Sequence, residues 1–488
     1  MEIISWNFLL FFTVTVAVYF VLNRRAQNIW LLFVSAFYIA LWGWQHLFPL
    51  AIIGGTTFLT GKKLGETRHP FWFAAGLSIN IAVFFLYRVI NSPLFSISTP
   101  PVIEDLLLPI GFAFYTLQSI SYLIDIHHSK IPAETEPVDF LLYLMFYPKI
   151  LAGPIERAGN FLPQLKSQRT VDSDKLDGGF VLVLVGLIRK IAIAEVLLTI
   201  MPENLFPTIP QEIGLYNGPI PAAIFAYSNL IPYTDRLIGI LAYGVYLYND
   251  FAGYTAIMRG ASLIMGFELS PNFHEPYFAN NLSDFWSRWH ISLSSWLRDY
   301  IYFPMTRILL KKYKNRFFLL PEVLPLIVTM LAAGFWHGLT YPFLLWGLVF
   351  GILMSLEKLI FQAFPLLRAK TRLLPLRFIN GLLVYLVVNI AWVAFAVNSV
   401  DGILSTWKAV LSAAGWFINP TFSFWIVVIS SVSFLLDFLE SRRYDQSILL
   451  GWPIAAKSIV LAIVWIILIL AFTWTSPFTS NVFVYQNF

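Results

Sequence analysis

Residues 323–356 read VLPLIVTMLAAGFWHGLTYPFLLWGLVFGILMSL, without one aspartate, glutamate, lysine or arginine. A helix of roughly 20 apolar residues crosses a bilayer, so this stretch predicts a membrane-embedded segment. Similar runs recur along the chain. They predict an all-α, polytopic transmembrane protein with about eleven spans, with re-entrant or interfacial helices among the weaker runs. The runs near spanning length are 3–22, 71–90, 178–200, 323–356, 379–398 and 455–473, and the shorter ones are 28–47, 104–124, 138–152, 237–265 and 423–438.

The overall composition also indicates a membrane protein. Charged residues make up 12% of the 488 residues and hydrophobic residues 58%, whereas a soluble protein usually has about 25% charged residues. No linker, low-complexity stretch or internal repeat divides the sequence, so we predict one membrane-embedded domain over residues 1–488.

Clusters of basic residues predict the topology. Arg24 and Arg25 directly follow the first apolar run, which predicts an uncleaved first span with a cytoplasmic end and an external N-terminus. Two more basic loops are expected on the cytoplasmic face, where they meet anionic headgroups. The net charge of +5 therefore indicates the lipid bilayer as a partner and no nucleic acid. The two loops contain Lys62, Lys63 and Arg68, and Arg307, Lys311, Lys312, Lys314 and Arg316.

The absence of cysteine limits the possible chemistry. Disulfides, thiolate metal sites and a cysteine nucleophile are excluded. No two histidines have the spacing of a helical zinc motif, so we predict no metal site.

His337 is the principal candidate for chemistry. It lies near the middle of 323–356, between Gly334 and Gly338. An ionisable residue at membrane depth indicates function by default. Desolvation keeps an imidazole neutral, and a neutral imidazole can act as a general base on a hydroxyl. The alternative is a histidine that is hydrogen-bonded to a neighbouring helix and serves packing alone.

The segment from Glu268 to Glu322 has no spanning-length run but is rich in tryptophan and tyrosine. Two sets of residues repeat in it at spacings of three and four, which predicts one amphipathic helix. This helix is expected either in the interface or folded inward against a polar cavity. His290 borders its aromatic face and is the second candidate, with a structural role as the alternative. The aromatic set is Trp286, Trp289, Leu293, Trp296 and Tyr300, and the polar set is Asp284, Arg288, Ser292, Ser295 and Asp299.

Asn249 and Asp250 interrupt another apolar stretch. An aspartate at the centre of a membrane helix costs about 2.5–3.5 kcal/mol on insertion scales, so Asp250 is expected to have a partner. An arginine or a tyrosine hydroxyl would suit, and Arg259 and Arg288 are the candidate arginines. A buried ion pair is favoured slightly over direct catalysis.

These residues, taken together, resemble the membrane-bound O-acyltransferase family, and most closely its alginate O-acetyltransferase-like branch. The central block, Asp284 to Tyr300, reads DFWSRWHISLSSWLRDY. The core motifs span about 105–360, and the resemblance fades beyond residue 400, so the helices of 400–488 are expected to diverge. The four other blocks that agree in order are PIGF at 109–112, AGPI at 152–155, DFAGY at 250–254 and GFWHG at 334–338.

The resemblance implies a helical fold around a central tunnel open to both faces of a bacterial plasma (inner) membrane. It implies acetyl-CoA as a cytoplasmic acyl donor, with no cofactor kept bound, and acetyl transfer to hydroxyls of an extracytoplasmic, alginate-like polysaccharide, directly or through a partner acetyltransferase. It makes His337 the base and gives His290 the role of orienting the donor or polarising its thioester carbonyl, and both are expected to line one cavity. The residues expected to bind substrate or line the tunnel are Asn249, Asp250, Trp286, Arg288, Trp289, Ser294 and Trp336.

The chain departs from the family pattern at three places. Met305-Thr306-Arg307 and a lysine-rich run stand where a glycine-rich turn is frequent, Ala396 where arginine is frequent, and Asn249 where phenylalanine is frequent. Acyl transfer from a carrier protein, as in D-alanylation of teichoic acid, is the alternative function. A secondary transporter is less favoured, because repeated halves are not found.

Overall fold

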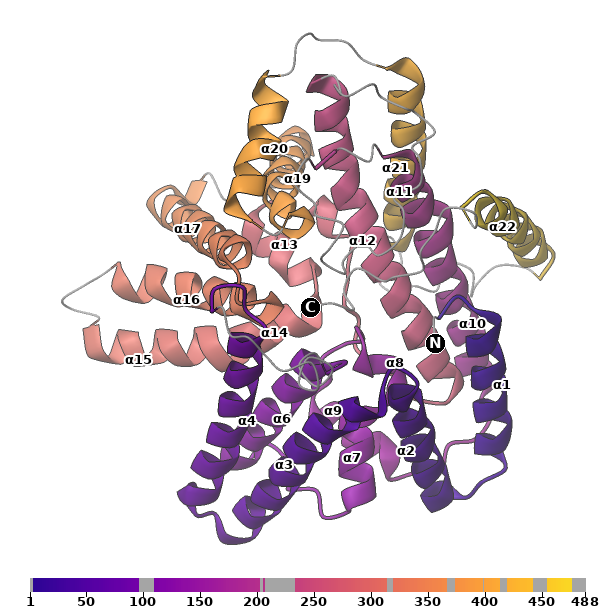
Figure 1. Ribbon diagram of the computed structural model, residues 1–488, viewed down its shortest axis with the longest axis vertical. Helices are drawn as coiled ribbons and strands as arrows, with labels where there is room; N and C mark the ends of the chain where they lie inside the picture. The colour runs from indigo at the N-terminus through magenta and orange to yellow at the C-terminus, as the bar shows by residue number, and fades with distance from the viewer. Residues whose placement is uncertain are drawn as a thin grey trace. The chain divides into compact units, whose positions relative to one another are not determined.

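Every regular element that the computed structural model describes is a helix, which confirms the all-α class (Figure 1). Lys314 and Arg316 of the third basic loop, and residues 104–108 of one apolar run, lie outside the described residues. The described residues are 3–95, 109–201, 205–206, 233–313, 319–366, 374–397, 399–412, 419–441 and 454–475.

Five of the described helices are long and apolar enough to cross a membrane. The prediction of about eleven spans is therefore not confirmed. The run 178–200 shows one reason, because it contains Arg189, Lys190 and Glu195 and forms a π-helix, η3, at Ile188–Glu195. The five candidate spans are Pro70–Ile90, Leu320–His337, Tyr341–Ala363, Leu376–Ala396 and Pro420–Glu440.

The described residues form two compact units, and the prediction of a single domain stays a prediction. Unit 1 comprises the described residues of 1–183 and 255–271, and unit 2 those of 184–254 and 272–484. The helices within unit 1 are α1 (Trp6–Phe20), α2 (Arg24–Ala40), η1 (Trp44–His46), α3 (Leu47–Thr67), α4 (Pro70–Ile90), α6 (Phe112–His127), α7 (Pro137–Met145), α8 (Tyr147–Ile150), α9 (Ala158–Phe161) and η2 (Leu162–Leu165).

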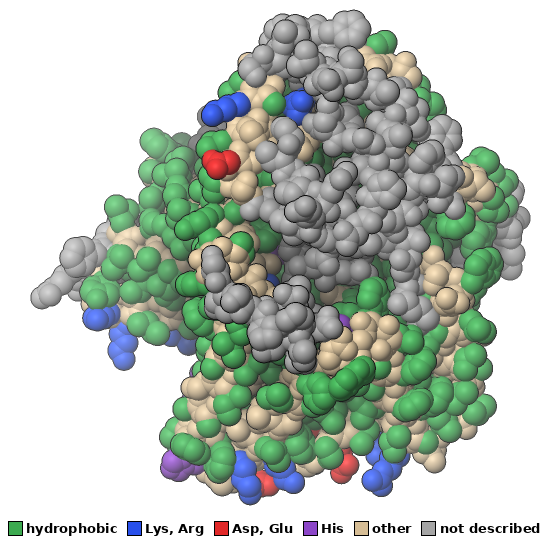
Figure 2. Space-filling view, viewed as in Figure 1, with side chains coloured by type: hydrophobic (Ala, Val, Ile, Leu, Met, Phe, Trp, Pro, Cys, Tyr) green, Lys and Arg blue, Asp and Glu red, His purple; other side chains and the backbone are tan. Residues whose placement is uncertain are grey.

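The N-terminal helices of unit 1 expose apolar side chains. Phe85 and Leu86 of α4 are each 54% exposed. Figure 2 shows apolar side chains over most of the visible face of these helices, with charged side chains gathered at their lower edge in this view. A water-facing surface rarely carries so large an apolar area, so this face indicates contact with lipid.

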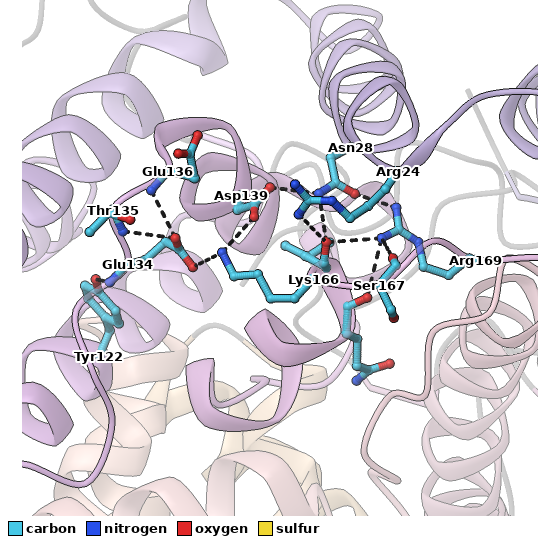
Figure 3. A network of polar contacts seen from close by, with 12 residues as sticks. Arg24, Asn28, Tyr122, Glu134, Thr135, Glu136, Asp139, Lys166, Ser167 and Arg169 are labelled. Carbon is cyan, nitrogen blue, oxygen red and sulfur yellow. Dashed lines mark hydrogen bonds and ion pairs between the residues drawn. The ribbon is translucent and has the colours of Figure 1, made fainter.

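A polar network holds the ends of several unit 1 helices together (Figure 3). Lys166 lies 2.7 Å from a carboxylate oxygen of Glu134 and 2.9 Å from one of Asp139. Asn28 of α2 donates to Asp139 at 2.8 Å and accepts a hydrogen bond from Arg169. Both carboxylates are therefore paired where they are buried, as the cost of desolvating a charge requires.

The charged side chains on either side of the AGPI block, Lys149 and Glu156, are buried and hydrogen-bonded inside unit 1. The buried ammonium of Lys149 donates to the side chain of Gln118 and to the backbone carbonyl of Tyr143. The carboxylate of Glu156 accepts hydrogen bonds from the backbone N–H and the hydroxyl of Ser270. Burial lowers the pKa of Lys149 and raises the pKa of Glu156.

Unit 2 contains the elements of the candidate site. Two helices contribute residues to both unit 1 and unit 2. They are α10 (Ser173–Leu187) and α12 (Tyr233–Ile264). The others are η3, α11 (Val196–Ile200), η4 (Pro276–Phe278), α13 (Leu282–Arg288), α14 (Ile291–Leu297), the π-helix η5 (Arg298–Tyr302), α15 (Phe303–Tyr313), α16 (Leu320–His337), α17 (Tyr341–Ala363), α19 (Leu374–Ala396), α20 (Val400–Ser412), α21 (Pro420–Ser441) and α22 (Ile454–Thr475).

The stretch 323–356 forms a hairpin of two helices, α16 and α17, rather than one segment. Gly338 ends α16. Thr340 begins α17, its hydroxyl accepting a hydrogen bond from the N–H of Phe343 at 3.4 Å, and Pro342 follows in the first turn. A side-chain oxygen at the N-cap and proline in the first turn are strong helix-start signals. The hairpin therefore follows from local sequence once the turn is recognised.

Glycines let the two helices approach closely. A Cβ on Gly334 would lie 2.2 Å from the carbonyl oxygen of Phe343, and one on Gly347 would lie 2.3 Å from that of Met330. Small residues at such crossings allow backbones to touch inside a membrane. This contact fixes the end of α16, where His337 lies.

Candidate active site

His337 is the last residue of α16 and lies beside the turn, not in the middle of a span as the length of the apolar run indicated. Its side chain is 5% exposed. Aromatic rings surround it, with centroids 4.9 Å away for Phe395, 5.6 Å for Trp346 and 5.9 Å for Phe343. The imidazole is therefore held in an apolar, aromatic environment within unit 2.

The predicted continuous amphipathic helix over 284–300 is wrong. Helix α13 ends at Arg288, α14 begins at Ile291, and His290 between them has a left-handed backbone with φ 43°. Asn272 stabilises this break, because its backbone carbonyl accepts from the N–H of Ile291 at 2.8 Å and its side chain accepts from the hydroxyl of Ser292 at 2.6 Å. The spacing pattern could not include this partner, which lies 20 residues from Ser292.

The strained backbone points to a function for His290. A non-glycine residue held in the left-handed region costs about 1–3 kcal/mol, and such residues cluster at active sites. His290 is 1% exposed, and burial lowers the pKa of its ring to about 3. The ring is neutral at ordinary pH, so it can orient or polarise a substrate without carrying charge.

Trp336 connects the two histidines. Its ring centroid lies 5.6 Å from that of His290 and 4.7 Å from that of His337, both edge to face. Trp336 itself is 2% exposed. Two histidines that are 47 positions apart in the sequence are thus brought into one buried aromatic cluster.

A cavity of about 470 Å³ adjoins this cluster. Neither histidine belongs to its lining, but Trp346 lines it and also contacts the ring of His337. Its wall includes both Trp346, which is 2% exposed, and Arg298, whose side chain is 54% exposed. The cavity therefore reaches from the surface to the vicinity of the buried histidine. A tunnel open to both membrane faces stays a prediction.

The other predicted residues of the central block have different surroundings. Trp286 and Ser294 line the cavity. Trp289 is buried against Trp392, with ring centroids 4.8 Å apart. Arg288 pairs with Asp284 at 2.7 Å and lies 3.9 Å from Glu275.

The partner of Asp250 is Lys190 of η3, and neither Arg259 nor Arg288. The side chain of Asp250 is 4% exposed and that of Lys190 9%. The predicted buried ion pair is present, although its partner was missed, and a role of Asp250 in substrate binding stays a prediction. Lys190 could have been recognised as a basic residue inside the apolar run 178–200.

Asn249 belongs to a second buried network. Its side-chain oxygen accepts from Arg189 at 3.2 Å and its nitrogen donates to the hydroxyl of Ser433 at 2.8 Å. Arg189 also pairs with Asp437 at 2.6 Å and Glu440 at 2.9 Å. A phenylalanine at 249 could make none of these hydrogen bonds, so the network explains this departure from the family pattern.

Glu357 of α17 is a further residue that sequence reasoning missed. Its carboxylate accepts from the N–H groups of Leu282 at 2.7 Å and Ser283 at 3.1 Å, and from the hydroxyl of Ser283 at 2.9 Å. A carboxylate at a helix N-terminus satisfies free N–H groups and complements the helix dipole. Glu357 therefore fixes the start of α13, which leads to His290.

Comparisons with known proteins identify related sequences. Residues 129–400 match the model of MBOAT, the membrane-bound O-acyltransferase family. The chain is 30% identical over 424 residues to the probable alginate O-acetylase AlgI of Azotobacter vinelandii, covering 83% of this chain and 77% of the relative. It is 26% identical over 540 residues to the peptidoglycan O-acetyltransferase of Helicobacter pylori, covering 96% and 94%.

A third relative aligns with a smaller part of the chain. The teichoic acid D-alanyltransferase of Bacillus subtilis is 28% identical over 260 residues, which cover 52% of this chain and 60% of the relative. The family match extends over more than half of the chain and includes both histidines, Trp336 and the cavity wall. The chain is an O-acyltransferase and belongs to the membrane-bound O-acyltransferase family.

Proposed function

We propose that this enzyme transfers an acetyl group from acetyl-CoA, taken from the cytoplasm, to hydroxyls of an extracytoplasmic polysaccharide in a bacterial plasma membrane. The observation that carries the proposal is the contact of Trp336 with both His290 and His337 beside the cavity. Relatives named as an alginate O-acetylase and a peptidoglycan O-acetyltransferase support acetyl as the group and a polysaccharide as the acceptor.

His337 acts as the base in this proposal. The oxygen of the acceptor hydroxyl bonds to the acyl carbon while its proton passes to the imidazole of His337. The C–S bond then breaks with its electron pair on sulfur, and the proton leaves with the thiol. Positioned proton transfer of this kind contributes about 10²- to 10⁴-fold in rate. His290, which is neutral, orients the thioester.

The cavity is the proposed site of the donor. Its wall carries Arg298 and Lys358 together with apolar residues such as Met330 and Met354. Cationic side chains suit the phosphates of CoA, and the apolar wall suits its pantetheine arm. The acyl group passes to the polymer either directly or through an extracytoplasmic partner acetyltransferase.

Transfer from an acyl carrier protein is the second candidate. It is supported by the relative named as a teichoic acid D-alanyltransferase, although that similarity covers about half of the chain. The two donors are distinguished by supplying acetyl-CoA alone to purified enzyme. Thiol release without a carrier protein is expected under the acetyl-CoA proposal.

The test of the proposal replaces His337 by alanine. Purified wild type and His337→Ala, reconstituted in nanodiscs, are compared for thiol release from acetyl-CoA and for acetyl esters on an added polysaccharide. The variant is expected to lose at least about 100-fold in rate. His128→Ala, at an exposed histidine of unit 1, is the matched control. A folded His337→Ala variant with full transfer activity would falsify the assignment.

A further inference from the structure

Three buried indole N–H groups in unit 2 have no hydrogen-bond acceptor among the described residues. They belong to Trp286, Trp346 and Trp392. The indole nitrogen only donates, and a buried tryptophan usually finds an acceptor for it. Each such group in a native structure needs an explanation, and a bound ligand is one.

Two of these three donors belong to the wall of the cavity. Trp286 and Trp346 line it, and their ring centroids lie 5.6 Å apart. Trp346 is also 5.6 Å from the ring of His337. Trp392 stacks on Trp346 at 6.0 Å but does not line the cavity. The donors on the wall are therefore gathered close to the proposed reacting residue.

The serine and threonine hydroxyls of the cavity wall already donate to protein oxygens, and the hydroxyl of Tyr302 on the same wall accepts a hydrogen bond from Lys358 at 3.0 Å. The serine hydroxyls donate to the backbone or to Glu357, and the threonine hydroxyl donates to the backbone. The indole N–H groups of Trp286 and Trp346, by contrast, are buried donors of wall residues without an acceptor among the described residues. The hydroxyl hydrogen bonds are Ser283 to Glu357 at 2.9 Å, Ser287 to Asp284 at 2.7 Å, Ser294 to Trp289 at 3.0 Å, Ser295 to Ser292 at 3.1 Å and Thr329 to Pro325 at 2.6 Å.

This arrangement indicates the chemistry of a ligand that would accept hydrogen bonds from the two indole N–H groups. The ligand must present acceptor oxygens at the end of the cavity near His337. A long hydrocarbon chain presents none and would leave both donors unsatisfied. A short acyl thioester presents its own carbonyl oxygen, and the pantetheine arm presents amide carbonyls next to it.

We propose that the indoles of Trp346 and Trp286 donate hydrogen bonds to carbonyl oxygens at the reacting end of the acyl-thioester donor. This inference rests on the proposed function and names the residues that recognise its donor. During transfer the thioester oxygen gains negative charge as the acceptor oxygen bonds to the acyl carbon. A donor aimed at that oxygen stabilises the transition state more than the ground state.

The experiment compares two ligands and three variants. Acetyl-CoA is compared with S-ethyl-CoA, in which a methylene group replaces the thioester carbonyl. Dissociation constants are measured for the wild type, Trp346→Phe, Trp286→Phe and Trp392→Phe in nanodiscs. Trp392→Phe is the matched control, because it removes an equally buried N–H that does not line the cavity.

The wild type is expected to prefer acetyl-CoA to S-ethyl-CoA by about 2- to 10-fold, the effect of one hydrogen bond. At least one of the variants Trp346→Phe and Trp286→Phe should abolish this preference, while Trp392→Phe retains it. The thermal midpoint without ligand should fall no more in the cavity variants than in Trp392→Phe, since no protein hydrogen bond is lost.

The possible outcomes distinguish the role of the two indoles from the proposed use of acetyl-CoA as the donor. A preference for acetyl-CoA that survives in both cavity variants overturns the inference and leaves the proposed function standing. A wild-type enzyme that binds no acetyl-CoA overturns the proposed donor, and the inference with it. A larger loss of stability without ligand in Trp346→Phe and Trp286→Phe than in Trp392→Phe means that the N–H groups bond within the protein, which also overturns the inference.

Discussion

The ring of Trp336 meets the ring of His290 edge to face, with centroids 5.6 Å apart and an interplanar angle of 78°. The next residue along the chain from Trp336 is His337. One side chain in α16 thus touches the junction between α13 and α14 while its neighbour carries the proposed base. The relative placement of the two histidines depends on this contact.

Replacing Trp336 by leucine is expected to lower kcat by about 10- to 100-fold, because displacing reacting groups by about 1 Å can cost about 100-fold. Trp336→Phe keeps an aromatic edge and should retain most of that activity. The Michaelis constant for acetyl-CoA should change less than kcat in both variants. Equal losses in the leucine and phenylalanine variants would show that the ring contact does not position the histidines.

His290 makes the stability of the fold sensitive to acid. Its pKa falls to about 3 in the folded protein from an ordinary value of 6.5, because burial disfavours the charged ring. Below pH 6.5 the unfolded chain binds a proton that the folded chain does not bind. Stability from this residue is therefore lost as pH falls from 6.5 toward 3, by up to about 1.4 kcal/mol per pH unit.

The measurement compares unfolding of the wild type and His290→Gln in detergent over this pH range. The variant should lose stability less steeply than the wild type between pH 6.5 and pH 4. Parallel pH profiles would mean that His290 is protonated in the folded protein.

The ion pair of Lys190 and Asp250 is buried, so removing one partner leaves an uncompensated charge. Lys190→Met is expected to destabilise the protein by about 3–5 kcal/mol. The double variant Lys190→Met/Asp250→Leu should recover most of this loss, since neither charge remains. Lys63→Met, which breaks the exposed pair of Lys63 and Glu66, is the control and should leave the unfolding midpoint unchanged.

The glycine contact between α16 and α17 is expected to tolerate no side chain. Gly334→Ala places a methyl group against the carbonyl oxygen of Phe343, and overpacking of this kind costs about 1–3 kcal/mol. It should also lower acetyl transfer, because His337 lies three residues further along the same helix. Gly55→Ala in α3, where the methyl group meets open space, should be neutral or stabilising. Similar stability in both variants would contradict this account of the hairpin.

Local patterns predicted the class of the fold and the two histidines. Apolar runs and a low fraction of charge predict membrane helices because the bilayer imposes that composition on any segment that crosses it. His337 stood out as an imidazole in an apolar run. The block around His290 carried the family resemblance, which the family match from 129 to 400 confirmed.

The tertiary structure decided what these residues contact. The chain itself contains no signal that the amphipathic pattern of 284–300 breaks at His290, because Asn272 stabilises the break from outside the pattern. Lys190 of η3 pairs with Asp250 of α12 because the fold places these two helices next to each other, which the sequence does not show. Hydropathy and spacing are local properties of a sequence, whereas hydrogen bonds, ion pairs and ring contacts depend on which helices are neighbours. The sequence therefore determined the membrane class and the candidate base. Only the fold decided that Trp336 contacts both histidines, and that this contact lies beside a cavity lined by Trp286 and Trp346, whose indole N–H groups have no acceptor among the described residues.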